Sequence, residues 1–211
     1  MSEESLEPVK KYYDYISVGN RTKQEVYFVE NHDKLVHFEL FIKENPSLQT
    51  VVICKSKKTA DALGDYLKSD TTSVIHGNHR ISQHQDTTKL FNKKEISTLI
   101  TTSKIYETLE LENIERILYY ELPFEPESYF KTLRAVDEVG ESILFVSIDD
   151  EKMLDTLELM MKYDIPQLEI EAFEHTALPK VDKSKKKKPR HKKKEKNQRK
   201  KRGLKSARTK P

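Results

Sequence analysis

The stretch from Thr98 to Pro123 constrains the fold of this chain more than any other, because two apolar runs of β type flank a polar, acidic segment in it. The runs span Thr98–Thr101 and Arg116–Tyr120, and similar runs alternate with amphipathic helical patterns elsewhere in the chain. We therefore expect these two runs to be neighbouring strands of a mostly parallel sheet. In open α/β sheets the groups that contact ligands lie beyond the carboxyl ends of strands, so residues 101–113 are predicted to be such a loop.

The rest of the chain continues this alternation of strand and helix, about five times in all. Apolar patterns predict further strands at 24–30, which would lie at an edge, and at 50–54, 72–75 and 142–148. Helical spacing predicts helices at 33–44, 56–67, 82–92, 126–136 and after 150. Ser56 and the pair Asp149–Asp150 are expected to cap the helices that follow them, and Leu90 and Phe91 to anchor the helix at 82–92. The predicted fold class is α/β, a three-layer α/β/α sandwich with a mostly parallel sheet.

We divide the chain into four parts on composition. Residues 1–20 are polar around several tyrosines, which predicts an arm or an irregular packing segment, and 21–165 form the α/β domain. Residues 166–179 are an extension that begins with a short strand or an extended cover at 167–173. Residues 180–211 contain almost no core-forming side chains, and we expect this tail to be disordered when it is not bound to a partner.

The tail is the strongest functional signal in the sequence. It holds 18 Lys or Arg residues and two acidic residues, whereas residues 1–179 hold 20 basic and 33 acidic residues. Neutralising even 6–10 phosphates releases enough counterions for strong, salt-sensitive binding without base recognition. RNA or ribosomal RNA is therefore the expected partner, and a nuclear or nucleolar targeting signal is the rival interpretation in a eukaryote. The basic residues predicted to bind RNA are Lys185, Lys186, Lys187, Lys188, Arg190, Lys192, Lys193, Lys194, Arg199, Lys200, Lys201 and Arg202.

Several other classes of protein are disfavoured. The single cysteine, Cys54, lies in an apolar run and is expected to be a buried hydrophobic residue, which suits a reducing, cytoplasmic compartment. The chain has no apolar run of membrane-spanning length, its N-terminus is too polar for a signal peptide, and the tail has no apolar partner face, so no membrane partner is expected. His76, His79 and His84 have no cysteine or suitably spaced acid beside them, so we predict no metal and no other cofactor.

Four short segments at fixed spacing resemble motifs of the second RecA-like domain of DEAD-box RNA helicases. They are VVICKS at 51–56, TLITTS at 98–103, ILYYELP at 117–123 and PESYF at 126–130. The resemblance implies a RecA-like fold for the sandwich and contacts to the RNA backbone from the loops at the strand ends. The matching positions in this chain are Lys55, Ser56, Lys57, Lys58, His76, Gly77, Thr101, Thr102 and Lys104.

The same resemblance marks positions at which a nucleotide site has degenerated. Glu107 and Glu110 stand where the family has the Arg and Asp of motif V, and motif VI falls on Lys131, Arg134, Ala135 and Glu138. The family's phosphate-contacting arginines would lie at Ala135 and Glu138, and such arginines are worth roughly 10³–10⁵ in rate. The sequence also has no GxxxxGK[ST] segment to hold phosphates. We therefore predict that this chain alone does not hydrolyse ATP.

These features together predict a non-catalytic RNA-binding protein, in which the tail supplies affinity and the body supplies positioning. One alternative is a protein-docking module, whose acidic residues Glu107, Glu110, Glu112 and Glu115 bind a basic partner such as a helicase or a ribosomal protein. A second alternative is one half of a split ATP-dependent RNA helicase, which a separately encoded first domain would complete.

Overall fold

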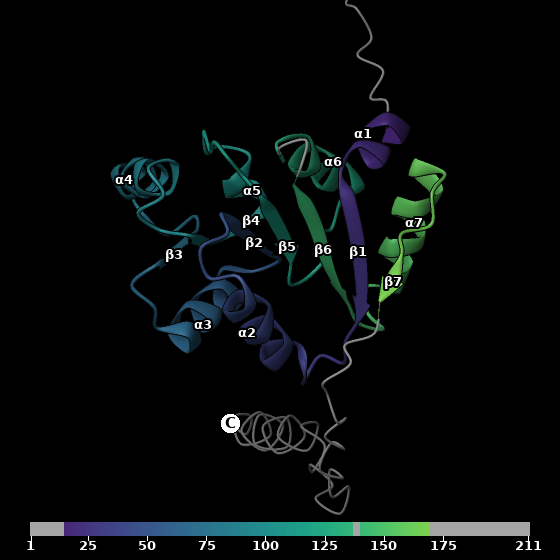
Figure 1. Cartoon of the computed structure of the whole chain (residues 1–211), viewed down its shortest axis with the longest axis horizontal. Coiled ribbons are helices and arrows are strands. Elements are labelled where there is room, and N and C mark those ends of the chain that lie inside the picture. The colour runs from purple at the N-terminus through teal and green to yellow at the C-terminus, as the bar shows by residue number, and fades with distance from the viewer. Residues whose placement is uncertain (1–14, 137–139, 169–211) are drawn as a thin grey trace, which may run out of the picture. The chain divides into compact units, whose positions relative to one another are not determined.

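The computed structural model describes residues 15–136 and 140–168, which form one seven-stranded parallel sheet with helices on both faces (Figure 1). The strands are β1 (Lys23–Phe28), β2 (Thr50–Cys54), β3 (Thr72–Ile75), β4 (Thr98–Thr102), β5 (Arg116–Tyr119), β6 (Glu141–Val146) and β7 (Gln167–Leu168). The helices are α1 (Tyr15–Arg21), α2 (Lys34–Glu44), α3 (Lys57–Leu67), α4 (Ile81–Asn92), α5 (Ser103–Tyr106), α6 (Pro126–Arg134) and α7 (Glu151–Met161). The predicted three-layer α/β/α fold with a parallel sheet is confirmed.

The order of the strands corrects the expectation that β4 and β5 are neighbours. The order is β3-β4-β2-β5-β6-β1-β7, so β2 lies between them. Val52 is in register with Ile100 on one side and with Leu118 on the other. All five residues of β2 are buried, as expected for a central strand, whereas adjacency in the sequence does not decide adjacency in a parallel sheet.

The first strand is also placed differently from the prediction. We expected an edge strand near 24–30, but β1 pairs with β6 along its whole length and with β7 on its other side. The pairing with β7 involves only Val26 with Gln167 and Tyr27 with Leu168. Polar and apolar residues alternate in β1, as we expected for an edge strand, because β7 pairs with only two of its residues. The edge strand on this side of the sheet is β7.

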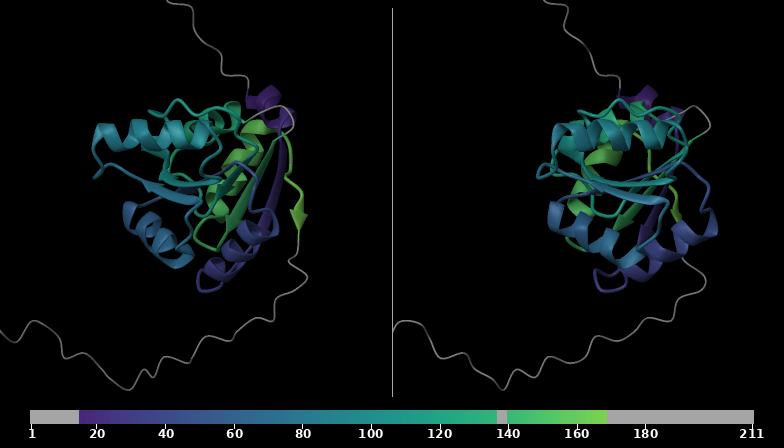
Figure 2. Two further views of the ribbon diagram at one scale, coloured as in Figure 1. Left: turned by 60° about the vertical axis from the view of Figure 1, so that its left-hand side comes forward. Right: turned by 90° about the vertical axis from the view of Figure 1, so that its left-hand side faces the viewer.

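Helices cover both faces of the sheet (Figure 2), and two separate apolar layers hold them against it. Alternate residues of β2 serve the two layers, because successive side chains in a strand point to opposite faces. Val51 and Ile53 pack on the side of α4, α5, α6 and α7, where α1 also lies, and Val52 and Cys54 pack on the side of α2 and α3. Cys54 is fully buried as predicted, and this burial raises the pKa of its thiol.

Residues 15–21 form a helix rather than the irregular segment that we expected. The Tyr15 ring lies 4.4 Å from the Phe130 ring of α6, centroid to centroid. Gly19 packs against Met161 of α7 so closely that a Cβ atom at this position would lie 2.6 Å from the Met161 sulfur. An aromatic contact, a close backbone approach and a hydrogen bond from the Arg21 guanidinium to the Arg134 carbonyl oxygen thus fix the helix to the domain.

The ends of the predicted helices were located well, with two differences. Ser56 caps α3 as predicted, since its hydroxyl accepts a hydrogen bond from the Thr59 backbone N–H at 3.0 Å. Asp150 stands at the N-cap of α7, but its carboxylate makes no capping bond and is used elsewhere. Phe91 anchors α4, whereas Leu90 is 37% exposed and contributes little to that anchor.

The predicted strand at 167–173 is a strand at 167–168, and its other residues, like the tail, lie outside the described residues.

No helix in the described ranges is long and apolar enough to cross a membrane.

Candidate nucleic-acid interface

The carboxyl ends of the parallel strands meet at one edge of the sheet, and the loops that follow β2, β3, β4 and β5 surround a cavity there. Its volume is about 480 Å³. Residues from the predicted RNA-contacting loops that line it are Lys55, Lys57, Gly77, Thr102 and Lys104. The structure thus brings together side chains that lie up to fifty residues apart in the sequence, as expected from the strand order.

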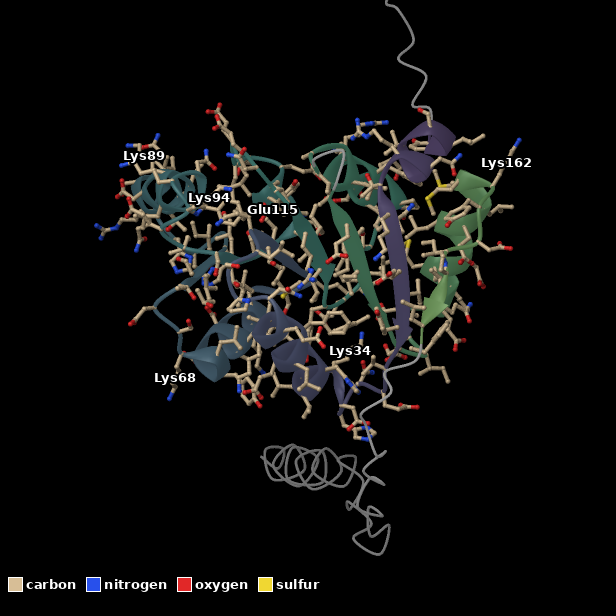
Figure 3. The ribbon with its side chains drawn as sticks, in the orientation of Figure 1. Lys34, Lys68, Lys89, Lys94, Glu115 and Lys162 are labelled. Atoms are coloured by element: carbon tan, nitrogen blue, oxygen red, sulfur yellow. The ribbon has the colours of Figure 1, made fainter. Side chains whose placement is uncertain are left out.

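Lys55 is held at the rim of the cavity by a buried ionic cluster. Its ammonium pairs with Asp150, whose other carboxylate oxygen accepts hydrogen bonds from Lys34 Nζ at 3.0 Å and from the Ser147 hydroxyl at 3.2 Å. Lys34 and Asp150 are only 2% and 3% exposed, and Figure 3 shows Lys34 beside the sheet. Burial of Asp150 raises its pKa, but the hydrogen bonds and charges of Lys55 and Lys34 outweigh it and hold the pKa of Asp150 below its usual value. The Glu121 carboxylate also accepts a hydrogen bond from the Lys55 backbone N–H at 2.9 Å, so this rim holds two ammonium groups and two carboxylates.

The first turn of α3 supplies further basic groups. Lys57 Nζ donates a hydrogen bond to the Asn78 side-chain oxygen at 2.8 Å, which ties α3 to the loop after β3. Lys58 and Lys104 are exposed and make no hydrogen bond or ion pair with the residues that the structure describes. Together with the N-terminal end of the α3 dipole, these groups favour an anion.

Four of the predicted RNA-contacting residues in these loops do not line the cavity, namely Ser56, Lys58, His76 and Thr101. His76 is buried, its Nε2 lies 2.7 Å from an Asp61 carboxylate oxygen and its Nδ1 accepts a hydrogen bond from the Asn78 N–H at 3.3 Å. Its side chain therefore holds the loop in place, and the neighbouring Gly77 faces the cavity. Thr101 is fully buried within the sheet, so Thr102 and the short helix α5 after it form the surface of the expected loop.

We predicted that His76, His79 and His84 bind no metal. In the structure these side chains contact one another and the backbone of their own segment. The rings of His76 and His79 stack at 4.1 Å, centroid to centroid. Burial and the neighbouring His76 lower the pKa of His79. In residues 15–136 and 140–168, no three or more His, Cys, Asp or Glu side chains form a group that could hold a metal ion.

Of the positions that match the family's nucleotide motifs, Glu107 and Lys131 bind each other. One Glu107 carboxylate oxygen accepts a hydrogen bond from Lys131 Nζ at 2.9 Å, and the other accepts one from the Ser128 hydroxyl at 3.0 Å. The Arg134 carbonyl oxygen accepts a hydrogen bond from the Arg21 guanidinium at 2.9 Å. Ala135 is exposed just after α6, and Glu138 lies outside the described residues. The charge of Lys131 is thus already matched by a carboxylate of this chain.

The acidic residues of the predicted docking surface do not act as one patch. Glu107 is paired with Lys131, and the Glu115 carboxylate accepts a hydrogen bond from the Gln49 backbone N–H at 2.9 Å. Glu107, Glu110 and Glu112 are all exposed, and the last two, in the segment between α5 and β5, have carboxylates without a hydrogen bond or ion pair to a described residue.

One residue at the cavity was not identified from the sequence. Phe124 lines the cavity and is 77% exposed, with Lys55 Nζ 5.4 Å from the centroid of its ring. The available signal was its position in a short segment between two prolines. Such a segment is predicted to be a loop, and an aromatic side chain in a loop is a candidate for ligand binding.

Comparison with known proteins agrees with the geometry. Residues 30–134 match the model of the helicase conserved C-terminal domain family. A probable ATP-dependent RNA helicase of Methanocaldococcus jannaschii, MJ0669, is 28% identical over 178 residues, which cover 80% of this chain and 48% of that protein. The chain therefore spans about half the length of that relative.

Solved structures show the same fold at lower identity. The structure of the E. coli DEAD-box protein SrmB bound to regulator of ribonuclease activity A superposes with a TM-score of 0.64 at 12% identity, covering 71% of this chain and 91% of that one. The structure of Mss116p DEAD-box helicase domain 2 bound to an RNA duplex gives a TM-score of 0.62 at 20% identity, covering 72% and 65%. At these identities the likeness establishes the RecA-like fold, and the sheet order and cavity described above are those of this chain.

Proposed function

Because residues 30–134 are a helicase conserved C-terminal domain with the fold of DEAD-box proteins, we propose that this chain is a non-catalytic RNA-binding protein. The observation that carries the proposal is the lysine-lined cavity at the carboxyl edge of the sheet. Lys55 and Lys57 follow β2 and Lys104 follows β4, and all three line the cavity beside the N-terminus of α3. Lysines and helix N-termini suit contacts to phosphate, which position a strand without reading its bases.

The basic tail complements this site. The body is acidic overall, with 20 basic and 33 acidic residues before position 180, so its long-range field repels a polyanion. The 18 basic residues of the tail would overcome this repulsion and supply most of the affinity, while the cavity fixes where the strand lies. A domain of this fold can hold RNA, since Mss116p domain 2 was solved with an RNA duplex.

The pairing of Glu107 with Lys131 supports a non-catalytic role. A carboxylate at this position repels the negative charge that develops on a transferred phosphoryl group, and its lysine partner is not available to offset that charge. No phosphate-binding GxxxxGK[ST] segment occurs in the 211 residues. We therefore propose that these residues do not hydrolyse ATP by themselves and need no nucleotide cofactor.

The test is a titration of a fluorescently labelled single-stranded RNA with the full chain over a series of salt concentrations. A variant with Lys57→Gln and Lys104→Gln is compared with a control carrying Lys89→Gln and Lys152→Gln, which loses the same charge away from the cavity. Each phosphate contact on a single strand contributes about 0.7 to the slope of log affinity against log salt, so the cavity variant should lose about 1.4 in slope and the control almost none. A full chain without measurable RNA binding at low salt would refute the proposal.

A protein-docking role is the second candidate, and one observation favours it. SrmB, which has the same fold, was solved in complex with a protein, regulator of ribonuclease activity A. In this chain Glu110 and Glu112 offer exposed carboxylates for a basic partner such as a ribosomal protein or a helicase. Reversal of both charges to lysine should then abolish capture of that partner and leave RNA affinity no lower than before.

A further inference from the structure

We infer that the cavity binds the base of one unpaired nucleotide, stacked on the ring of Phe124. This inference rests on the proposed RNA-binding function and adds a contact that backbone recognition does not require. It makes the site selective for a single strand, because the bases of a duplex are stacked inside the helix and are not available to a protein side chain.

The first argument is that Phe124 is exposed although the backbone around it is restrained. The ring is 77% exposed, although the two residues before it, Leu122 and Pro123, are buried. Pro123 and Pro126 fix two backbone angles of this short segment, and Pro126 begins α6. The Phe124 ring is therefore held in solvent by a loop whose backbone is restrained and whose preceding residues are buried.

The second argument is the charge beside the ring. Lys55 Nζ lies 5.4 Å from the ring centroid and is held by Asp150, which Lys34 and Ser147 fix in turn. The ammonium lies over one face of the ring, so a base would stack on the opposite face, and the cation then lies close to the phosphate linked to that base. Lys57 and Lys104 lie around the same cavity and can hold the flanking phosphates.

The third argument is the space that Gly77 leaves. None of the glycines that the structure describes has a positive φ angle, so the backbone conformation at Gly77 does not demand glycine. A Cβ atom there would touch only the Ile105 side chain, at 3.9 Å, and a longer side chain would extend into the cavity. Glycine therefore keeps the cavity open between Ile105 and Phe124. Its volume of about 480 Å³ lies in the roughly 300–1,000 Å³ range of small-molecule sites.

The carboxylates at the cavity do not oppose this ligand. Glu107 is neutralised by Lys131, and Glu125 at the rim is exposed. A carboxylate can accept a hydrogen bond from the exocyclic amine of adenine, cytosine or guanine, so Glu125 adds a contact to a base that carries one. The phosphates would contact the lysines instead.

The experiment measures binding of the full chain to two strands of equal length and charge, an oligocytidine RNA and its abasic ribose-phosphate counterpart. Phe124→Ala should weaken binding of the oligocytidine by about 5- to 150-fold, the range for loss of one base stack, and leave the abasic strand unchanged. Phe124→Tyr keeps a ring and should retain most of the affinity. Gly77→Val should weaken binding of the oligocytidine by filling the space. Leu159→Ala is the matched control, because this exposed apolar residue lies on α7, away from the cavity.

The outcomes separate this inference from the proposed function. If the unsubstituted chain binds neither strand, the RNA-binding proposal fails and the inference fails with it. If it binds both strands and Phe124→Ala weakens both equally or neither, RNA binding stands and base stacking is refuted. If the chain binds free cytidine monophosphate more tightly than the oligocytidine, and Phe124→Ala abolishes binding of the monophosphate, the site is one for a free nucleotide. That result would overturn the inference.

Discussion

Substitution of Asp150 by asparagine should destabilise the domain strongly, because the Asp150 carboxylate pairs with the ammonium groups of both Lys34 and Lys55. Lys34 is 2% exposed and donates to the Tyr120 and Phe145 carbonyl oxygens at 3.1 Å each, in addition to Asp150. Asparagine keeps the shape of the side chain but removes the charge that neutralises Lys34. Loss of one partner from a buried pair costs about 3–5 kcal/mol.

The free energy of unfolding is measured by urea denaturation of the full chain, followed by circular dichroism. A loss of this size lowers the melting temperature of a protein of this length by about 6–20 °C. Lys55→Met is the internal comparison: its side chain is 23% exposed and its removal leaves the Lys34–Asp150 pair intact, so it should cost about 1 kcal/mol or less. The double variant Lys34→Met with Asp150→Leu should recover most of the loss, because apolar residues can replace a buried ion pair.

The effect should also depend on pH in a defined direction. The pKa of Asp150 is lowered in the folded protein, so its carboxylate stabilises the fold at neutral pH, and this contribution disappears as the pH falls through the folded pKa. The difference between the unsubstituted chain and Asp150→Asn should therefore shrink as the pH falls below about 4, the usual pKa of an aspartate. An Asp150→Asn variant within about 1 kcal/mol of the unsubstituted chain at pH 7 would refute the description of the cluster as a paired, buried charge.

Three further substitutions test other contacts by the same urea assay. Gly19→Ala should cost about 1–3 kcal/mol through overpacking against Met161, and Met161→Ala in the same chain should relieve the clash; equal stability of Gly19→Ala and the parent would contradict the close approach. Ser56→Ala should cost about 1 kcal/mol through loss of the α3 cap, and Ser56→Asp should retain that stability. Removal of both partners of the exposed pair, by Glu107→Gln with Lys131→Met, should change stability by less than about 1 kcal/mol and produce no ATPase activity in a coupled assay.

Much of the fold could be predicted from the sequence because each strand is a short apolar run and each helix has an apolar face. The residues of β2 and the cap at Ser56 are examples in which a local pattern decides a local structure. The insertion of β2 between β4 and β5 could not be predicted in this way, since strand order in a parallel sheet depends on how the crossover helices pack and not on any one segment.

The candidate site shows the same division. Lys55, Lys57, Gly77 and Lys104 were predicted from their match to the RNA-contacting positions of DEAD-box helicases, and the structure places them around one cavity. Phe124 was not identified, because a single aromatic residue in a loop has the same appearance in the sequence whether it is buried or exposed. The cluster that holds Lys55 also depends on residues more than ninety positions apart, which no local pattern connects.

The pairing of β1 with β6 has a consequence for the order of events as the chain folds. Lys23 is in register with Glu141, and α1 packs on α6 and α7, so the first described segments meet their partners only after most of the chain exists. The strands β2, β3, β4 and β5 lie closer together in the sequence and pair with one another, so they can associate first. The entropy cost of closing a long loop is incurred before the stabilising contacts between its ends form. We therefore expect the pairing of β1 with β6 to be the late, slow step. Until then Val26 and the edge of β6 remain uncovered, and the nascent chain is most prone to aggregation during that interval.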